Sequence, residues 1–145
     1  MGLPIISSWK RVSGQKSLDI HLVEKQETNI NLIKKKKIKI NFYKKIPKNW
    51  KGDVIFFAVK PQDFNKVAEE ININNVSYKN IVSIMAGITT SKIRSYLKTQ
   101  TSVTRVMPNL AVEVNLGVNC IFHSSNSKNL FKKNINSLFG ILGNN

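Results

Sequence analysis

The sequence predicts an α/β fold with a doubly wound, mostly parallel sheet, and two observations carry this prediction. First, Val54–Val59 form an uninterrupted apolar run, which is typical of a strand buried on both faces of a sheet. Second, Pro61 follows where a helix tolerates proline, and apolar residues then recur at the spacing of one helical stripe. The members of that stripe are Phe64, Val67, Ala68 and Ile71. The rest of the chain also alternates strands and helices, as parallel crossover units require.

Before the central strand, the pattern predicts one helix and two strands. Residues 1–13 are expected to form the helix, and apolar and polar residues alternate over 18–23 as in a strand. A short outer strand is expected over 38–43, after a solvated turn at Lys34–Lys37. His21 has no acidic or cysteine residue arranged around it, so we interpret it as a half-exposed strand histidine.

After the central strand, helices and strands continue to alternate within one domain of 145 residues. The expected elements are, in order, a helix over 63–71, a strand over 81–86, a helix carrying Ile93, Tyr96 and Leu97, strands over 102–107 and 117–122, and a last helix capped near Ser127. Thr89, Thr90 and Ser91 offer N-caps for the second of these helices.

The formal net charge of +15 invites comparison with nucleic-acid-binding proteins. Of the 23 basic residues, however, only three are arginines, namely Arg11, Arg94 and Arg105. Arginine forms bidentate hydrogen bonds with phosphates and base edges better than lysine does. A protein dedicated to binding nucleic acid would therefore contain more arginine. We therefore expect no specific nucleic-acid partner, and only a diffuse, salt-sensitive attraction to polyanions.

Three further features indicate the compartment. The longest wholly apolar run is about six residues, against the roughly 20 that a membrane helix needs, so no membrane partner is expected. The first residues lack the charged-then-apolar layout of a secretory signal. Cys120 is the single cysteine, which excludes an internal disulfide. Together these features predict a cytoplasmic protein.

Ligands of doubly wound folds bind at the carboxyl ends of the strands, which predicts a site around Ala58, Val59, Lys60 and Pro61. The strand expected over 81–86 ends in Ala86 followed by Gly87. Such small residues let a ligand approach the backbone closely, although a tight turn alone would also explain them.

Glu24 follows the strand at 18–23, where an acid would hold the ribose hydroxyls of NAD. It lies 22 positions after Gly2, close to the usual spacing from the last glycine of a dinucleotide-binding fingerprint. Lys25, beside it, would meet the 2′-phosphate of NADP. An ordinary charged pair ending a strand is the alternative interpretation, and the choice between the two cofactors stays open.

Three segments, taken together and in this order, resemble the N-terminal domain of pyrroline-5-carboxylate reductase. They are Ala58-Val59-Lys60-Pro61-Gln62, Ser83-Ile84-Met85-Ala86-Gly87-Ile88 and Arg105-Val106-Met107-Pro108-Asn109, with Gly117 a few residues beyond. Any one of these segments would be a weak signal, whereas all three with similar spacing are a specific one. The resemblance extends over nearly the whole chain.

The resemblance implies hydride transfer from NADPH or NADH to the C=N carbon of pyrroline-5-carboxylate, which makes L-proline. Catalysis would then rest on orienting cofactor and substrate, with no catalytic side chain assigned and no metal. By the same resemblance, Ala58 to Pro61 would line the cofactor. Ile84, Met85 and Ala86 would pass close to the nicotinamide half, and Asn109 would offer its amide near cofactor and substrate.

The chain also departs from the family at both ends. Met1-Gly2 resembles the end of a Gly-x-Gly-Asn-Met-Gly turn that receives the pyrophosphate, so we expect a Rossmann-like sheet lacking the usual first strand. The family's helical second domain, with its dimer interface and substrate-gripping loops, has no counterpart in the sequence. Residues 1–145 are therefore expected to form one partial dinucleotide-binding domain.

Three readings of function remain open at this stage. The first is a pyrroline-5-carboxylate reductase homologue, which would bind its cofactor weakly and be inactive as an isolated chain. The second is a non-catalytic remnant that at most binds a dinucleotide or a partner. The third is a basic protein associated with nucleic acid.

Overall fold

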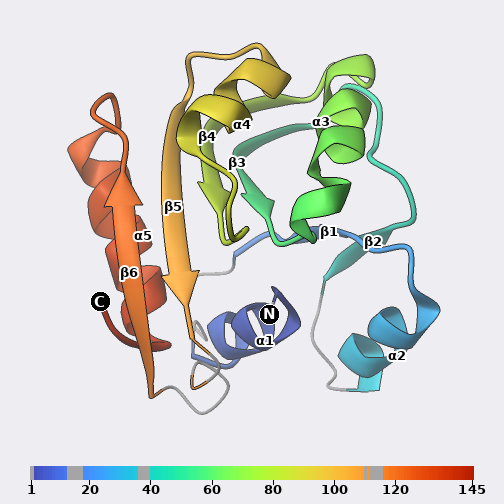
Figure 1. Ribbon diagram of the computed structural model, residues 1–145. Helices are drawn as coiled ribbons and strands as arrows, with labels where there is room; N and C mark the ends of the chain where they lie inside the picture. Colours follow the sequence, from blue (N-terminus) through green and yellow to red (C-terminus); the bar gives the residue numbers. More distant parts are fainter. Residues whose placement is uncertain (1, 13–17, 36–39, 110, 112–115) are drawn as a thin grey trace.

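The structure, a computed structural model, describes residues 2–12, 18–35, 40–109, 111 and 116–145 (Figure 1). The end of the helix expected over 1–13 and half of the turn expected at Lys34–Lys37 lie outside the described residues. The elements in chain order are α1 (Gly2–Val12), β1 (His21–Val23), α2 (Glu27–Lys35), β2 (Asn41–Tyr43), β3 (Lys51–Phe57), the 3₁₀ turn η1 (Pro61–Asp63), α3 (Phe64–Ile73), β4 (Ser77–Ser83), α4 (Thr90–Leu97), β5 (Ser102–Pro108), β6 (Gly117–His123), α5 (Asn129–Gly140) and β7 (Gly143–Asn144).

A five-stranded sheet in the order β3-β4-β5-β6-β7 forms the centre of the fold. Strands β3, β4 and β5 are parallel, with Ile55 opposite Ile81 and Ile81 opposite Val103. Strand β6 runs antiparallel to β5, and β7 runs parallel to β6. The prediction of a mostly parallel α/β sheet is therefore confirmed.

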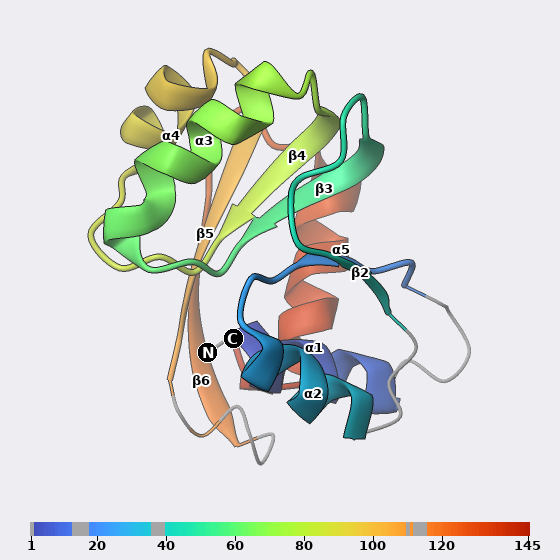
Figure 2. The same ribbon diagram turned by 90° about the vertical axis from the view of Figure 1, so that its right-hand side faces the viewer.

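Helices cover both faces of this sheet (Figure 2). On one face, α3 and α4 bury Phe64, Ile71 and Ile93 against Phe57 and Ile81, among other apolar residues. On the other face, α1 and α5 contribute a second apolar cluster, whose buried residues are Ile5, Trp9, Val82, Val106, Ile135, Phe139 and Leu142. This two-sided cover is the doubly wound arrangement that the sequence predicts.

The indole of Trp9 joins the two helices on the second face. Its Nε1 donates a hydrogen bond to the carbonyl of Leu138 at 2.8 Å. Its ring contacts those of Phe56 and Phe139 edge-on, each with 5.4 Å between centroids. Buried indole N–H groups need such a partner, so α1 is fixed both by apolar packing and by a polar contact.

The strand expected over 18–23 does not join the central sheet. It is shortened to β1 and pairs with β2 in a separate two-stranded parallel sheet, with Leu22 opposite Phe42. Among the residues described, β3 has β4 as its only strand neighbour. Strand β1 therefore belongs to a separate two-stranded sheet rather than to the five-stranded one.

Local boundaries also differ from expectation in three places. Strand β3 begins at Lys51 and β4 spans Ser77–Ser83, so the expected strand at 81–86 is shifted toward the amino end by pairing with β3. Helix α2 was not predicted, because Lys34 and Lys35 were assigned to a turn, yet Ile30 and Ile33 form its buried stripe.

Among the three candidates offered for the N-cap of α4 the structure has Thr89, and the N-cap of α5 lies one residue after Ser127. The hydroxyl of Thr89 accepts a hydrogen bond from the backbone N–H of Lys92 at 3.1 Å, as an N-cap does. Helix α5, in contrast, has Lys128 at its N-cap with no side-chain bond. Ser127 instead donates its backbone N–H to the carbonyl of Ser124 at 3.0 Å, which closes the preceding turn.

Candidate functional site: the carboxyl edge of the sheet

Strands β3, β4 and β5 are parallel neighbours, so their carboxyl ends meet at one edge of the sheet (Figure 1). The segments that follow them are Ala58–Pro61, Ile84–Gly87 and Asn109. We call these segments, with the N-terminus of α1, the carboxyl edge. Nine of the ten residues that the sequence proposes for cofactor binding belong to it, and the tenth, Glu24, does not.

Gly2 and Ala58 approach each other so closely that no side chain fits between them. A Cβ atom built on Gly2 would lie 2.8 Å from the Cβ of Ala58, shorter than real Cβ contacts. Glycine therefore lets the first turn of α1 lie directly against the end of β3, the role of a fingerprint glycine in helix–strand packing. The free N–H groups and positive dipole end of α1 are thereby placed at the carboxyl edge.

The segment after β3 has the local structure that its sequence predicts. Lys60 is extended, with φ −65° and ψ 143°, and Pro61 begins the 3₁₀ turn η1 as expected. The backbone N–H of Asp63 donates to the carbonyl of Lys60 at 2.9 Å and closes this turn. Ala58, Lys60 and Pro61 are exposed and Val59 is half-buried. The segment thus presents a small side chain and one cation to solvent.

After β4, two backbone N–H groups are bonded within the fold. The N–H of Ile84 donates to the carbonyl of Phe57 at 3.0 Å, and the N–H of Met85 donates to the hydroxyl of the buried Ser83 at 3.2 Å. The side chain of Met85 is only 2% exposed and packs in the core. Ala86 and Gly87 are exposed, and Gly87 has φ +70°. A ligand at this edge would therefore meet Ala86 and Gly87 rather than the side chain of Met85.

Asn109 follows β5 and bonds two backbone groups on either side of residues 112–115 in the sequence. Its Oδ1 accepts hydrogen bonds from the N–H groups of Ala111 at 3.2 Å and Val118 at 3.3 Å. Because both partners are donors, these bonds determine which end of the amide is the oxygen. The Nδ2 group takes no part in either bond, and the residue is exposed. Asn109 thus combines a structural acceptor with a donor group directed elsewhere.

Glu24 lies at the end of β1, on the smaller sheet. One carboxylate oxygen accepts from the N–H of Gln26 and the other from Nδ2 of Asn29, both at 2.9 Å. The neighbouring Lys25 faces Glu70 of α3, with 3.8 Å between Nζ and Oε2. Glu24 therefore already supports the turn into α2, while Lys25 makes only a long, solvent-exposed ion pair.

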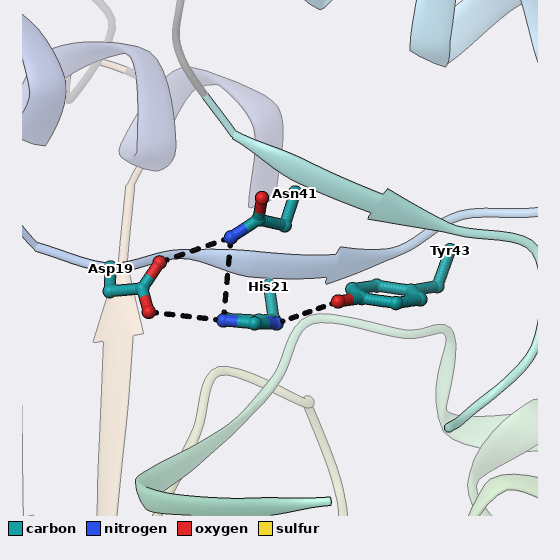
Figure 3. Close-up of polar contacts among 4 residues, drawn as sticks. All are labelled: Asp19, His21, Asn41 and Tyr43. Atoms are coloured by element: carbon teal, nitrogen blue, oxygen red, sulfur yellow. Dashed lines mark hydrogen bonds and ion pairs between the residues drawn. The ribbon is translucent and has the colours of Figure 1, made fainter. Parts of the chain in front are cut away.

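A polar cluster on β1 and β2 was not anticipated from the sequence (Figure 3). His21 Nε2 lies 3.1 Å from the Asp19 carboxylate and Nδ1 lies 3.2 Å from the Tyr43 hydroxyl. Asn41 donates its Nδ2 to Asp19 at 3.1 Å. The interpretation that no acid is arranged around His21 is therefore wrong. Asp19 and His21 are two positions apart in an extended segment, so they share a face, and this spacing was the available signal.

The cluster has the features of a structural contact. Both ring nitrogens of His21 are within hydrogen-bonding distance of a side chain, Asp19 for Nε2 and Tyr43 for Nδ1. The ring also stacks on Tyr43 and meets the ring of Trp50 edge-on, with 5.6 Å between centroids in each case. Trp50 directly precedes β3, so these rings tie the two sheets together.

The carboxyl edge fits a long, phosphate-bearing cofactor. It offers a helix N-terminus that suits a phosphate, small residues that permit close approach, and the amide of Asn109. Gly2 lets the first turn of α1 pack directly against Ala58 at this edge. Within the part of the chain that the structure describes, no three His, Cys, Asp or Glu side chains gather as metal ligands. In that same part, no helix has the length and apolar character to cross a bilayer.

Comparison with known proteins identifies similar sequences. The model of the family described as NADP oxidoreductase, coenzyme F420-dependent, matches residues 14–87. Pyrroline-5-carboxylate reductase of Haemophilus influenzae is 31% identical over 93 residues, and that of Staphylococcus aureus strain COL is 35% identical over 91 residues. These alignments cover 64% and 63% of this chain and 34% of each relative. The chain thus spans about a third of the length of these curated relatives.

Solved structures resemble this chain over its whole length. A pyrroline-5-carboxylate reductase from Coxiella burnetii superposes with a TM-score of 0.78 at 19% identity, over 99% of this chain and 53% of that one. The Plasmodium falciparum pyrroline carboxylate reductase with NADP bound gives 0.72 at 20%, over 99% and 52%. Prephenate dehydrogenase from Aquifex aeolicus gives 0.71 at 11%, over 100% and 56%. At these identities the structural likeness shows the fold alone.

Proposed function

Since this chain belongs to the family described as NADP oxidoreductase, coenzyme F420-dependent, we propose that it is the dinucleotide-binding part of a pyrroline-5-carboxylate reductase. The observation that carries the proposal is the identity of 31% and 35% to two curated reductases of that name. The reaction would be the NAD(P)H-dependent reduction of 1-pyrroline-5-carboxylate to L-proline. A cytoplasmic site of action fits the single cysteine.

Different residues of the carboxyl edge would contact different parts of the cofactor. The N-terminus of α1, brought close by Gly2, suits the pyrophosphate. Ala58 and Ala86 leave room for the cofactor to approach the backbone, while the exposed Lys60 adds a positive charge. The bound cofactor supplies the hydride. The chain's own contribution is to orient the nicotinamide, and the Nδ2 group of Asn109 is the side-chain donor that we assign to this task.

Asn109 can be tested with a substitution that separates its two functions. In Asn109→Asp, the carboxylate still accepts from the N–H groups of Ala111 and Val118, so the loop is retained. The donor is lost, however, and a negative charge is added. We expect an unchanged urea midpoint and cofactor binding at least about tenfold weaker, as the loss of one charge-assisted or buried hydrogen bond implies. Binding equal to that of the unmodified chain would remove Asn109 from the site.

We propose NADP, rather than NAD, as the cofactor. Both carboxylate oxygens of Glu24 are already occupied by Gln26 and Asn29, so this acid is poorly placed to receive ribose hydroxyls. The Lys25 ammonium has only a long contact with Glu70 and could turn toward a 2′-phosphate. The crystal structure of the Plasmodium falciparum relative has NADP bound.

Lys25→Ala tests this choice of cofactor. It should weaken NADPH binding while leaving NADH binding unchanged, because only NADPH carries the 2′-phosphate. Lys66→Ala, which removes an equally exposed charge from α3, is the matched control and should change neither. Isothermal titration of the three proteins with both nucleotides gives the comparison. Equal losses for both nucleotides, or tighter NADH than NADPH binding by the unmodified chain, would contradict the assignment of NADP.

The reductase activity is tested separately from cofactor binding. The chain corresponds to about a third of its curated relatives, so we expect the 145 residues alone to bind NADPH without useful turnover of pyrroline-5-carboxylate. Orientation of the imine carbon against the hydride donor is worth roughly 7–11 kcal/mol in favourable cases, and it requires residues that hold the substrate. A fusion to the remaining part of the Haemophilus influenzae reductase should restore proline formation.

A second candidate is a non-catalytic protein that binds a dinucleotide or a partner. A fusion that binds NADPH tightly yet makes no proline would support this candidate. Absence of nucleotide binding in both the chain and the fusion would overturn the dinucleotide-binding proposal itself.

A further inference from the structure

One face of β6 is apolar and exposed. Four residues lie on this face at alternate positions, namely Leu116, Val118, Cys120 and Phe122. Leu116 is 76% exposed, Val118 54% and Phe122 60%, and Cys120 is also exposed. Met107 and Arg105 of the adjacent β5 stand opposite Cys120 and Phe122 in the antiparallel register, so they share this side. We call these six residues the β6 face.

Helices cover the other side of β6 but not this one. Asn119 donates its Nδ2 to the carbonyl of Phe139, and Ile121 packs with the α1–α5 cluster, so the odd-numbered residues face α5. On the opposite side the α3–α4 cluster includes Val103 of β5, and Arg94 of α4 donates to Asn126 just beyond the end of β6. Figure 1 shows β6 in front of α5 with no helix in front of it, and Figure 2 agrees. The helix layer formed by α3 and α4 thus stops before β6.

Arg105 lies within the β6 face and has no carboxylate partner among the residues that the structure describes. Its Nη2 is 3.8 Å from the sulfur of Met107, and its Nε is buried with no hydrogen-bond acceptor. None of the ion pairs found among the described residues involves this guanidinium. Arginine, methionine and phenylalanine are also the residues enriched in the cores of protein interfaces.

The charge of this half of the chain indicates which partner would fit. Residues 71–145 contain eight basic residues and one acidic residue, Glu113. In a pair of copies of the chain, a net charge of +15 would face another of +15, and the Arg105 residues of the two copies would lie near each other. Both effects are repulsive. A partner with negative charge instead satisfies Arg105 and is attracted over a longer range.

We propose that the β6 face docks an amphipathic helix from an acidic partner protein. The apolar stripe of this helix covers Val118, Cys120 and Phe122, continuing the layer that α3 and α4 begin, as helices on α/β sheets do. A carboxylate at the border of the stripe pairs with Arg105. This site is independent of the carboxyl edge and of the proposed reductase function.

Cys120 provides a direct readout, because it is the single cysteine and lies on the β6 face. The probe is a synthetic helical peptide with leucines at i, i+3, i+4 and i+7 bordered by glutamates. A second peptide replaces every glutamate with lysine and keeps the same apolar stripe. The rate of Cys120 alkylation by the uncharged reagent iodoacetamide is followed by mass spectrometry. We expect the acidic peptide to slow alkylation and the basic peptide to leave it unchanged.

Two variants locate the contact. Arg105→Met should weaken the protection given by the acidic peptide about tenfold or more, as the loss of a hydrogen-bonded ion pair implies. Phe122→Glu should abolish protection. Leu130→Glu, at a residue of α5 that is 71% exposed, is the matched control and should retain it. Circular dichroism and urea midpoints show whether each variant is folded, and a folded Arg105→Met protein alone suffices for the comparison.

Three results would overturn the proposal. Equal protection by both peptides would show an apolar surface without preference for an acidic partner. No protection by either peptide would show that the β6 face does not take a helix. Protection that appears without peptide as protein concentration rises, with dimers in analytical ultracentrifugation, would assign the face to a second copy of the chain.

Discussion

Gly2→Ala tests whether close packing between α1 and β3 positions the carboxyl edge. The added Cβ would lie 2.8 Å from the Cβ of Ala58, about 1 Å inside ordinary carbon–carbon contact. The Ala58 methyl is attached directly to the backbone of the residue after β3, so relief requires a shift of α1 or of the strand end. Overpacking of this kind costs about 1–3 kcal/mol. Alanine has the higher helix propensity, by up to about 1 kcal/mol, which offsets part of the loss.

We therefore expect Gly2→Ala to lower the free energy of unfolding by about 1–2 kcal/mol in urea titrations. Ala58→Gly removes the opposing methyl. In that background, adding Gly2→Ala should therefore cost little unfolding free energy. Residues in direct contact give coupling energies of about 0.5–3 kcal/mol in such cycles. A Gly2→Ala protein as stable as the unmodified chain, or a coupling energy near zero, would refute the packing argument.

Two further predictions concern stability. Thr89→Ala removes the acceptor for the N–H of Lys92 and should cost about 1 kcal/mol of unfolding free energy, whereas Thr89→Ser should cost little; equal losses in urea would show that the cap does not matter. Burial raises the pKa of Tyr78 above its ordinary value, against the opposing hydrogen bond with Thr99. The Tyr78 hydroxyl thus holds its proton more tightly in the folded chain than in the unfolded chain. The contribution of this group to stability is therefore complete below about pH 10 and is lost as pH rises through the folded pKa. The stability difference between the unmodified chain and Tyr78→Phe should therefore shrink above about pH 10 in urea titrations, and a constant difference would contradict the shift.

The central elements could be predicted from the sequence because their signals are local and strong. The apolar run at Val54–Val59 identifies β3, although two of its residues lie beyond the strand end. Pro61 marks the following turn, and Thr89 gives the N-cap of α4. In each case one short segment contains both the apolar pattern and the residue that ends the strand or begins the helix, so tertiary contacts do not have to be known.

Other features depend on partners far away in the sequence. Strand β4 begins at Ser77 because it pairs with Lys51, which no local pattern reveals. Helix α2 has a weak sequence signal, because only Ile30 and Ile33 form its buried stripe and its last turn consists of lysines. The contact of His21 with Tyr43 joins two strands, and the separation of their sheet from β3 follows from pairings rather than from composition.

The carboxyl edge explains why sequence indicates the position of the candidate site better than the role of each residue. At Gly2, Ala58 and Ala86 the requirement is small size, and the side chain of Met85 points into the core. A motif at this edge therefore indicates only that a ligand can approach the backbone closely. Many different ligands can do so. In the proposed site, specificity would come from the polar side chains assigned to cofactor binding, namely those of Asn109, Lys60 and Lys25. Substitutions at these three residues therefore test the proposed cofactor against other ligands of the same fold, whereas substitutions at the small residues test only whether the space is needed.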